Sequence, residues 1–164
     1  HSYPILIEVG KANKPVLLKR GWSATLEEWV FAAEYVAAEG NLDIILCERG
    51  IRTFSQNEYN RNTIDLNVVP AVRERTFLPI IVDPSHATGR AELVAPLSKA
   101  ALAVGADGLI IEVIASNTDR CDVLCDGEQS IRPNALREIV EFAHGTPAGK
   151  RVLRGRRSVP LIPG

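Results

Sequence analysis

The clearest structural signal in the chain is the stretch LPIIVDPSHATGR, residues 78–90. Its run at 79–82 is apolar on both faces, which is typical of a parallel strand covered by helices. Asp83 and His86 follow directly at the carboxyl end of that run. Parallel α/β sheets and barrels keep their chemistry at this end of the strands. The stretch therefore predicts a buried parallel strand that leads into a functional site.

Two further apolar runs end in the same way. Residues 44–47 lead into Glu48 and Arg49, and residues 109–111 lead into Glu112. The carboxyl ends of parallel strands meet at one edge of a sheet or barrel. The three strand ends, which carry histidine, arginine and glutamate, therefore indicate one shared site.

The rest of the chain alternates strands with helices, and the pattern predicts an α/β fold of parallel β/α units. The expected elements are a helix end at 3–10, a strand at 14–21, a helix from a capping box at Thr25 and Glu28 to Gly40, a strand at 44–48, a short helix near 65–75, a strand at 79–83, a helix at 91–104, a strand at 108–113 and a helix at 133–144. Four units are too few for a closed (β/α)8 barrel, which needs about 250 residues. We expect half a barrel over residues 1–145; the alternative is a four-stranded open sandwich, which would have to protect both sheet edges.

Composition excludes several classes of protein. The 164 residues are 46% hydrophobic with a formal net charge of −1, so nothing global favours nucleic acid or membrane. No apolar run approaches the roughly 18 residues of a membrane span, and no signal peptide is present, so we expect a cytoplasmic protein. Three cysteines argue against a disulfide framework. The absence of methionine indicates a processed chain or a fragment, and the tail at 146–164 is expected to be irregular, basic and rich in Pro and Gly.

Several motifs occur in the order found in a known enzyme family. They include KPVLLKRG at 14–21, ILCERGIRTF at 45–54, LPIIVDPSHATGR at 78–90, GADGLIIEV at 105–113 and DGEQS at 126–130. With them the chain resembles the C-terminal half of a type I 3-deoxy-D-arabino-heptulosonate 7-phosphate (DAHP) synthase, of the subtype related to 3-deoxy-octulosonate 8-phosphate synthase. The resemblance implies the fifth to eighth strands of a TIM (β/α)8 barrel. It also implies a metal-dependent condensation of phosphoenolpyruvate with erythrose 4-phosphate, which begins the shikimate route to aromatic amino acids.

The resemblance further implies a divalent metal held by His86, Glu112 and Asp126. One imidazole and two carboxylates suit Mn²⁺, Fe²⁺, Co²⁺ or Zn²⁺. The loop before Asp126 is longer than the family pattern, so Asp122 is an alternative ligand. The same loop holds Cys121 and Cys125, either of which could replace a thiolate that the family supplies from a strand with no counterpart here; the simpler interpretation is that both are small loop residues.

The family pattern also assigns residues to catalysis and substrate binding. Lys19, Arg49 and His86 match catalytic positions; Lys19 and Arg49 would hold phosphoenolpyruvate, because an ammonium and a guanidinium fork neutralise phosphate and carboxylate. Further substrate contacts are expected from Glu48, Asp83 and Arg52, although structural support is an equal alternative for the two acids.

Three rival interpretations remain. The chain could be one half of an enzyme that needs a missing N-terminal half-barrel or a homo-oligomer to act. It could be a non-catalytic half-barrel that binds phosphorylated ligands or serves in assembly. It could also be the related 3-deoxy-octulosonate 8-phosphate synthase. The joint presence of Lys19, Arg49, His86 and Glu112 favours an enzyme.

Overall fold

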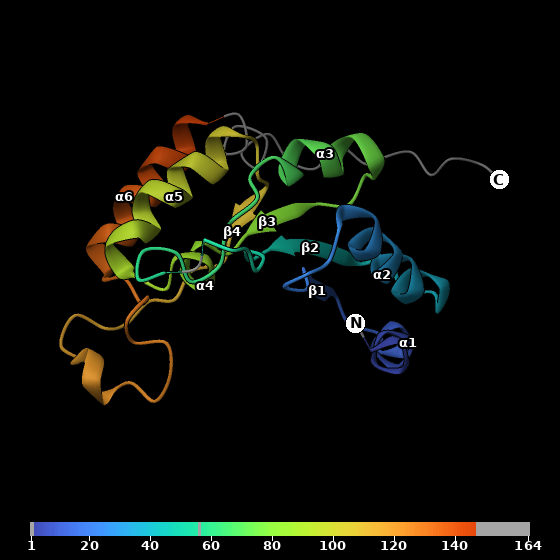
Figure 1. The fold of residues 1–164 in the computed structure, drawn as a ribbon, viewed down its shortest axis with the longest axis horizontal. Coiled ribbons are helices and arrows are strands. Elements are labelled where there is room, and N and C mark those ends of the chain that lie inside the picture. The colour runs from blue at the N-terminus through green and yellow to red at the C-terminus, as the bar shows by residue number, and fades with distance from the viewer. Residues whose placement is uncertain (1, 56, 147–164) are drawn as a thin grey trace.

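A computed structural model describes residues 2–55 and 57–146 and contains a parallel four-stranded sheet with helices packed against it (Figure 1). The strands lie side by side in chain order, and each neighbouring pair is parallel. Their bounds are Val16–Lys19 for β1, Ile44–Glu48 for β2, Ile80–Val82 for β3 and Gly108–Leu109 for β4. The predicted α/β fold of successive β/α units is confirmed.

The helices connect these strands and continue the chain after β4. They are α1 at Tyr3–Lys11, α2 at Leu26–Ala38, α3 at Val68–Arg75, α4 at Pro84–Thr88, α5 at Ala91–Ala103 and α6 at Pro133–Gly145. A 3-10 turn at Arg120–Asp122 interrupts the long loop before α6. The predicted capping box starts α2: the Glu28 amide donates to Thr25 Oγ1 at 3.2 Å, and the Thr25 amide donates to Glu28 Oε2 at 2.8 Å. Within the described residues, no helix is long and apolar enough to span a membrane.

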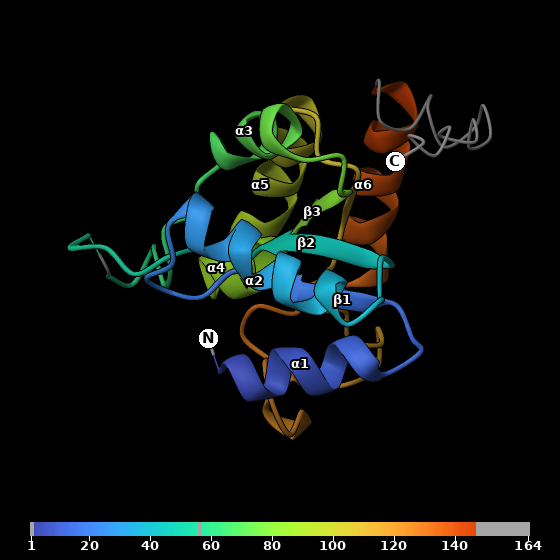
Figure 2. The ribbon, with the colours of Figure 1, turned by 90° about the vertical axis from the view of Figure 1, so that its right-hand side faces the viewer.

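The main core lies between the sheet and helices α2, α3 and α5. Alternate strand residues point into it, among them Leu46 and Ile80, which pair across β2 and β3 and are fully buried. Trp29 of α2 and Val69 of α3 are fully buried against the same face. A second cluster joins α5 to α6, and α1 packs beside α2 (Figures 1 and 2). Burial of these apolar faces provides the main stabilisation of the fold.

The opposite face of the sheet is less covered. Leu17 is 38% exposed, whereas its neighbour Leu18 is 8% exposed and belongs to the core. Ile45 and Ile81 also point away from the core and are only partly buried. Parallel sheets normally have both faces covered. The exposed face and the edge strands β1 and β4 are the features expected of half a barrel.

The observed elements differ from the predicted ones mainly around β3 and β4. The strand predicted at 108–113 ends at Leu109, because β3 stops at Val82 and the chain turns into α4, so β3 offers no partner beyond Ile110. Further along, Val113 forms only an isolated parallel bridge with Ile131. Helix α4 was not predicted, although Asp83 caps it and Pro84 occupies a favourable first position. Except for Thr146, which follows α6, the predicted tail lies outside the described residues.

Candidate active site

The parallel strands bring the predicted residues to one edge of the sheet. Lys19 is the last residue of β1, Glu48 is the last residue of β2, and Asp83 directly follows β3. The register keeps these ends level, since Lys19 pairs with Cys47 and Glu48 pairs with Val82. Polar groups from three strands therefore share one side of the molecule.

Asp83 connects Lys19 to His86. Its side chain is 1% exposed, and Oδ2 accepts a hydrogen bond from Lys19 Nζ at 2.9 Å and lies 2.8 Å from His86 Nδ1. The other oxygen, Oδ1, accepts from the His86 backbone amide at 3.0 Å. A carboxylate beside Nδ1 favours the tautomer with its proton there, so that Nε2 keeps its lone pair. Asp83 thus orients the imidazole with Nε2 pointing away from it, in a position suited to a ligand.

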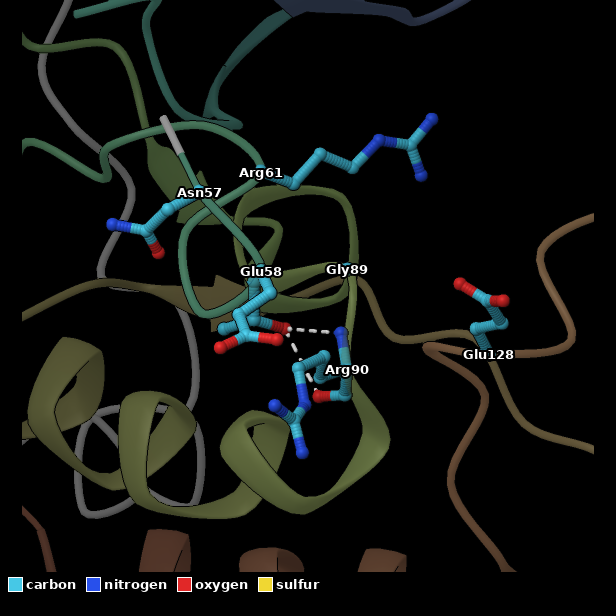
Figure 3. Close-up of a pocket in the computed structure, with 7 residues that line it drawn as sticks. Asn57, Glu58, Arg61, Gly89, Arg90 and Glu128 are labelled. Atoms are coloured by element: carbon cyan, nitrogen blue, oxygen red, sulfur yellow. Dashed lines mark hydrogen bonds between the residues drawn. The ribbon is translucent and has the colours of Figure 1, made fainter. Parts of the chain in front are cut away.

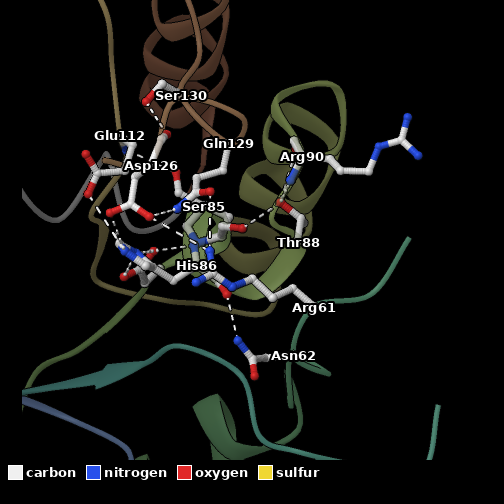
Figure 4. A network of polar contacts seen from close by, with 12 residues as sticks. Arg61, Asn62, Ser85, His86, Thr88, Arg90, Glu112, Asp126, Gln129 and Ser130 are labelled. Carbon is white, nitrogen blue, oxygen red and sulfur yellow. Dashed lines mark hydrogen bonds and ion pairs between the residues drawn. The ribbon is translucent and has the colours of Figure 1, made fainter. Parts of the chain in front are cut away.

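Two carboxylates face that nitrogen. His86 Nε2 lies 3.5 Å from Asp126 Oδ2 and 4.0 Å from Glu112 Oε1 (Figure 4). Ligand atoms of the three residues all lie within 4.8 Å of one another. Two carboxylates and an imidazole lone pair gathered in this way attract a cation, and one nitrogen with two oxygens suits a divalent transition metal. The donor set therefore fits the metal expected from the sequence.

Local hydrogen bonds hold these two carboxylates in place. The Glu112 amide donates to Oγ of the fully buried Ser85 at 3.0 Å. Asp126 has a φ of +57°, a left-handed conformation that aspartate adopts more readily than most residues. Gln129 donates a side-chain hydrogen bond to the Asp126 carboxylate, and Arg61 lies 3.8 Å from it. These contacts position the loop that carries Asp126.

The alternative ligands do not join this group. Among residues 2–55 and 57–146, the one cluster of three or more donors able to hold a metal contains neither Asp122 nor a cysteine. Cys121 and Cys125 are free and exposed. Cys47 is fully buried, and burial raises the pKa of its thiol from 9.0 to about 12, which keeps it protonated. Asp126 is thus the loop residue that meets His86.

Glu48 takes part in a buried ion-pair network on the helix side of the sheet. Arg20 donates to Glu48 at 2.9 Å and to Asp65 at 3.0 Å, and the Gly50 amide donates to Glu48 at 2.6 Å. Burial raises the pKa of Glu48, although Arg20 beside it favours the ionised form. Both carboxylate oxygens of Glu48 are therefore occupied within the protein, which gives this residue a supporting position. Arg20 was not singled out from the sequence, because a charge next to a strand end commonly lies at the surface.

Arg49 and Arg52 extend from the loop after β2 towards an aromatic ring. Their guanidinium carbons lie 5.3 Å and 4.3 Å from the centre of the Trp22 ring, which comes from the loop after β1. Within the described residues, neither arginine forms an ion pair with a carboxylate. Two cations without acidic partners make this part of the sheet edge suitable for an anion.

A pocket of about 440 Å³ has Arg61 in its lining, and Arg61 lies 3.8 Å from Asp126 (Figure 3 shows the lining residues). Its lining combines basic, acidic and neutral side chains and comprises Asn57, Glu58, Arg61, Thr88, Gly89, Arg90 and Glu128. Arg61 belongs to both regions, since it also lies near Asp126. Arg90 is paired with Glu92 and lies 5.1 Å from the Tyr59 ring. Arg61 therefore links this pocket to the candidate metal site.

Comparisons with known proteins agree with these features. Residues 1–147 match the sequence profile of the DAHP synthetase I family. The chain is similar to a phospho-2-dehydro-3-deoxyheptonate aldolase of Thermotoga maritima, with 50% identity over 140 residues that make up 85% of this chain and 40% of the relative. It is also similar to a 2-dehydro-3-deoxyphosphooctonate aldolase of Syntrophotalea carbinolica, with 33% identity over 148 residues, or 84% of this chain and 50% of the relative.

A solved structure extends the similarity to the fold. A truncated form of 3-deoxy-D-arabino-heptulosonate 7-phosphate synthase from Thermotoga maritima superimposes with a TM-score of 0.80 at 46% identity, covering 94% of this chain and 55% of that one. The chain thus spans 40% of the length of the first curated relative and about half of the others described here.

Proposed function

The chain belongs to the DAHP synthetase I family, and we propose that it carries the metal-binding and phosphoenolpyruvate-binding part of a DAHP synthase. Such an enzyme condenses phosphoenolpyruvate with erythrose 4-phosphate and releases inorganic phosphate. The observation that carries the proposal is the meeting of His86, Glu112 and Asp126 at the same sheet edge as Lys19 and Arg49.

His86, Glu112 and Asp126 would hold a divalent metal ion, with Asp83 setting the imidazole. When bound, such an ion supplies Lewis-acid polarisation of the aldehyde carbonyl of erythrose 4-phosphate. The protein's contribution is to keep a nitrogen and two carboxylate oxygens aimed at one point. Mn²⁺, Fe²⁺, Co²⁺ and Zn²⁺ all suit this donor set.

The cationic residues would bind phosphoenolpyruvate. Arg49 and Arg52 offer guanidinium forks to the phosphate, and Lys19 offers a point charge held by Asp83. In the condensation, C3 of phosphoenolpyruvate bonds to the aldehyde carbon, water adds to C2, and phosphate leaves with cleavage of its bond to that carbon. Lys19 and Arg49 stabilise the charge on the phosphate and carboxylate and fix the direction of approach.

The heptulosonate reaction is preferred over the octulosonate reaction. The relative named for the first is 50% identical to this chain, whereas the relative from Syntrophotalea carbinolica named for the second is 33% identical. A polypeptide segment that supplies the other strands, or a second copy of the chain, would complete the barrel. A cytoplasmic location remains a prediction of the same proposal.

The proposal is tested by complementation. The full chain, Mn²⁺ and both substrates are mixed with a second polypeptide. This polypeptide spans the part of the Thermotoga maritima relative that the chain does not cover. We expect product and phosphate release from the mixture, and none when His86→Ala replaces the wild type. If the chain binds phosphoenolpyruvate but no mixture condenses it, the proposal fails in favour of a non-catalytic binding module.

A further inference from the structure

Trp22 occupies an unusual place for an exposed aromatic residue. It lies in the loop between β1 and α2, is 45% exposed, and belongs to neither apolar core cluster. The guanidinium groups of Arg49 and Arg52 nevertheless both lie within the range of a cation–π contact with its ring, with Cζ at 5.3 Å and 4.3 Å from the ring centre. One indole ring thus gathers two like charges that would otherwise repel each other.

Within residues 2–55 and 57–146, these two arginines have no carboxylate partner of the kind that pairs with a structural arginine. Arg20, two residues before Trp22, donates to Glu48, to Asp65 and to the Ala24 carbonyl. By contrast, Arg49 Nε is buried and has no hydrogen-bond partner in the described part of the chain. A buried donor left without an acceptor is costly, so this guanidinium is held in place without using its full hydrogen-bonding capacity within the described residues. The two guanidinium groups are therefore available to an anion as donors.

A backbone contact fixes the distance between the two loops. The Arg52 amide donates to the Trp22 carbonyl at 2.7 Å, which joins the loop after β1 to the loop after β2. Beyond Arg52, the Thr53 hydroxyl bonds to Thr63 at 2.6 Å, so the loop is also held on its far side. The ring and the two guanidinium groups are thus carried on connected backbone, which reduces the entropy lost when a ligand binds.

We propose that Trp22 is a positioning residue that holds Arg49 and Arg52 as a pair for one phosphate group. The identity of that group as the phosphate of phosphoenolpyruvate rests on the proposed function. The arginine pair would also bind inorganic phosphate. Trp22 touches the two cations and acts through them. The indole face stabilises each guanidinium while leaving its N–H groups free to donate to the anion.

The test measures binding by the full chain with inorganic phosphate and, separately, with phosphoenolpyruvate, by isothermal titration calorimetry. Trp22→Ala should weaken both affinities about tenfold, and Trp22→Phe should restore them to within about threefold of wild type. Phe54→Ala is the matched control, because Phe54 is a fully exposed aromatic residue of the same arginine-bearing loop, and its loss should change neither affinity. The affinity of the His86 cluster for Mn²⁺ and the urea midpoint should stay unchanged in Trp22→Ala, which separates positioning from general destabilisation.

The outcomes distinguish this inference from the proposed function. If Trp22→Ala binds phosphate as tightly as wild type while Arg49→Ala does not, the role of Trp22 is overturned and the substrate assignment of Arg49 stands. If Trp22→Ala and Arg49→Ala both lose inorganic phosphate, but wild type shows no preference for phosphoenolpyruvate and no condensation when mixed with the complementing polypeptide, the arginine pair stands and the proposed function falls. A wild-type chain that binds no phosphate overturns the inference.

Discussion

Replacing Asp83 by asparagine should separate metal binding from folding. Asparagine keeps the size of the side chain but removes its charge. Its NH₂ group must face donors in either orientation: Lys19 Nζ and His86 Nδ1, which share Oδ2 in the wild type, or the His86 backbone amide, which donates to Oδ1. The loss of one charge-assisted hydrogen bond costs about 1.5–3 kcal/mol. Loss of a carboxylate that orients a ligating histidine typically lowers metal affinity about 10–100-fold, which is the same range of free energy. We therefore expect Asp83→Asn to bind Mn²⁺ about 10–100 times more weakly than wild type.

The assay is calorimetric titration of the full chain with Mn²⁺, with urea unfolding measured in parallel. Asp107→Asn is the matched control, because Asp107 also accepts two hydrogen bonds, from Arg73 at 2.8 Å and from the Ile80 amide at 3.0 Å, but lies at the amino end of β3. This control should lose stability and keep its affinity for Mn²⁺. If Asp83→Asn lowers stability but binds Mn²⁺ like wild type, Asp83 does not orient His86 for a metal and the reasoning is refuted.

Four further predictions rest on burial and on buried charge. At about pH 8, a thiol reagent should label Cys121 and Cys125 quickly and Cys47 only after unfolding, because burial raises the pKa of Cys47 from 9.0 to about 12; rapid labelling of all three would contradict this. Because its folded pKa is the higher one, the stability that Cys47 contributes is present below pH 9.0 and is lost as the pH rises towards 12, so a Cys47→Ala variant should show a shallower alkaline decline in its urea midpoint. Arg20→Leu should cost about 3–5 kcal/mol in urea unfolding, because it leaves Glu48 buried without its cation, whereas a loss below about 1 kcal/mol would show that this network is dispensable. The exposed sheet face should make the isolated chain associate with itself at high concentration in sedimentation velocity, and a monomer at every concentration would count against half a barrel.

The strands and their order could be read from the sequence because each strand is an aliphatic run followed by a polar residue. Helix α4 and the early end of β4 could not be read from the sequence, since both depend on where β3 stops. Val82 ends the strand, Asp83 caps a helix at once, and the chain after Leu109 is left without a strand to pair with. Such ends are decided by tertiary hydrogen bonds, which local hydrophobicity does not report.

The candidate site divides in a similar way. The types and positions of His86, Glu112 and Asp126 were evident from motifs, and the structure brings their donor atoms together. The supporting roles of Arg20 and Trp22 were not evident. Both roles depend on partners distant in sequence, namely the acids that pair with Arg20 and the arginines that approach the Trp22 ring.

The position of a bound metal tests the central claim most directly. Crystals of the full chain grown or soaked with Mn²⁺ can be measured at a wavelength where manganese scatters anomalously. The account predicts an anomalous peak enclosed by His86 Nε2, Glu112 and Asp126, and its loss in His86→Ala. A peak at Cys121 or Cys125 instead, or no peak at the strand ends when the crystals contain Mn²⁺, would contradict the assignment of this sheet edge as the metal site.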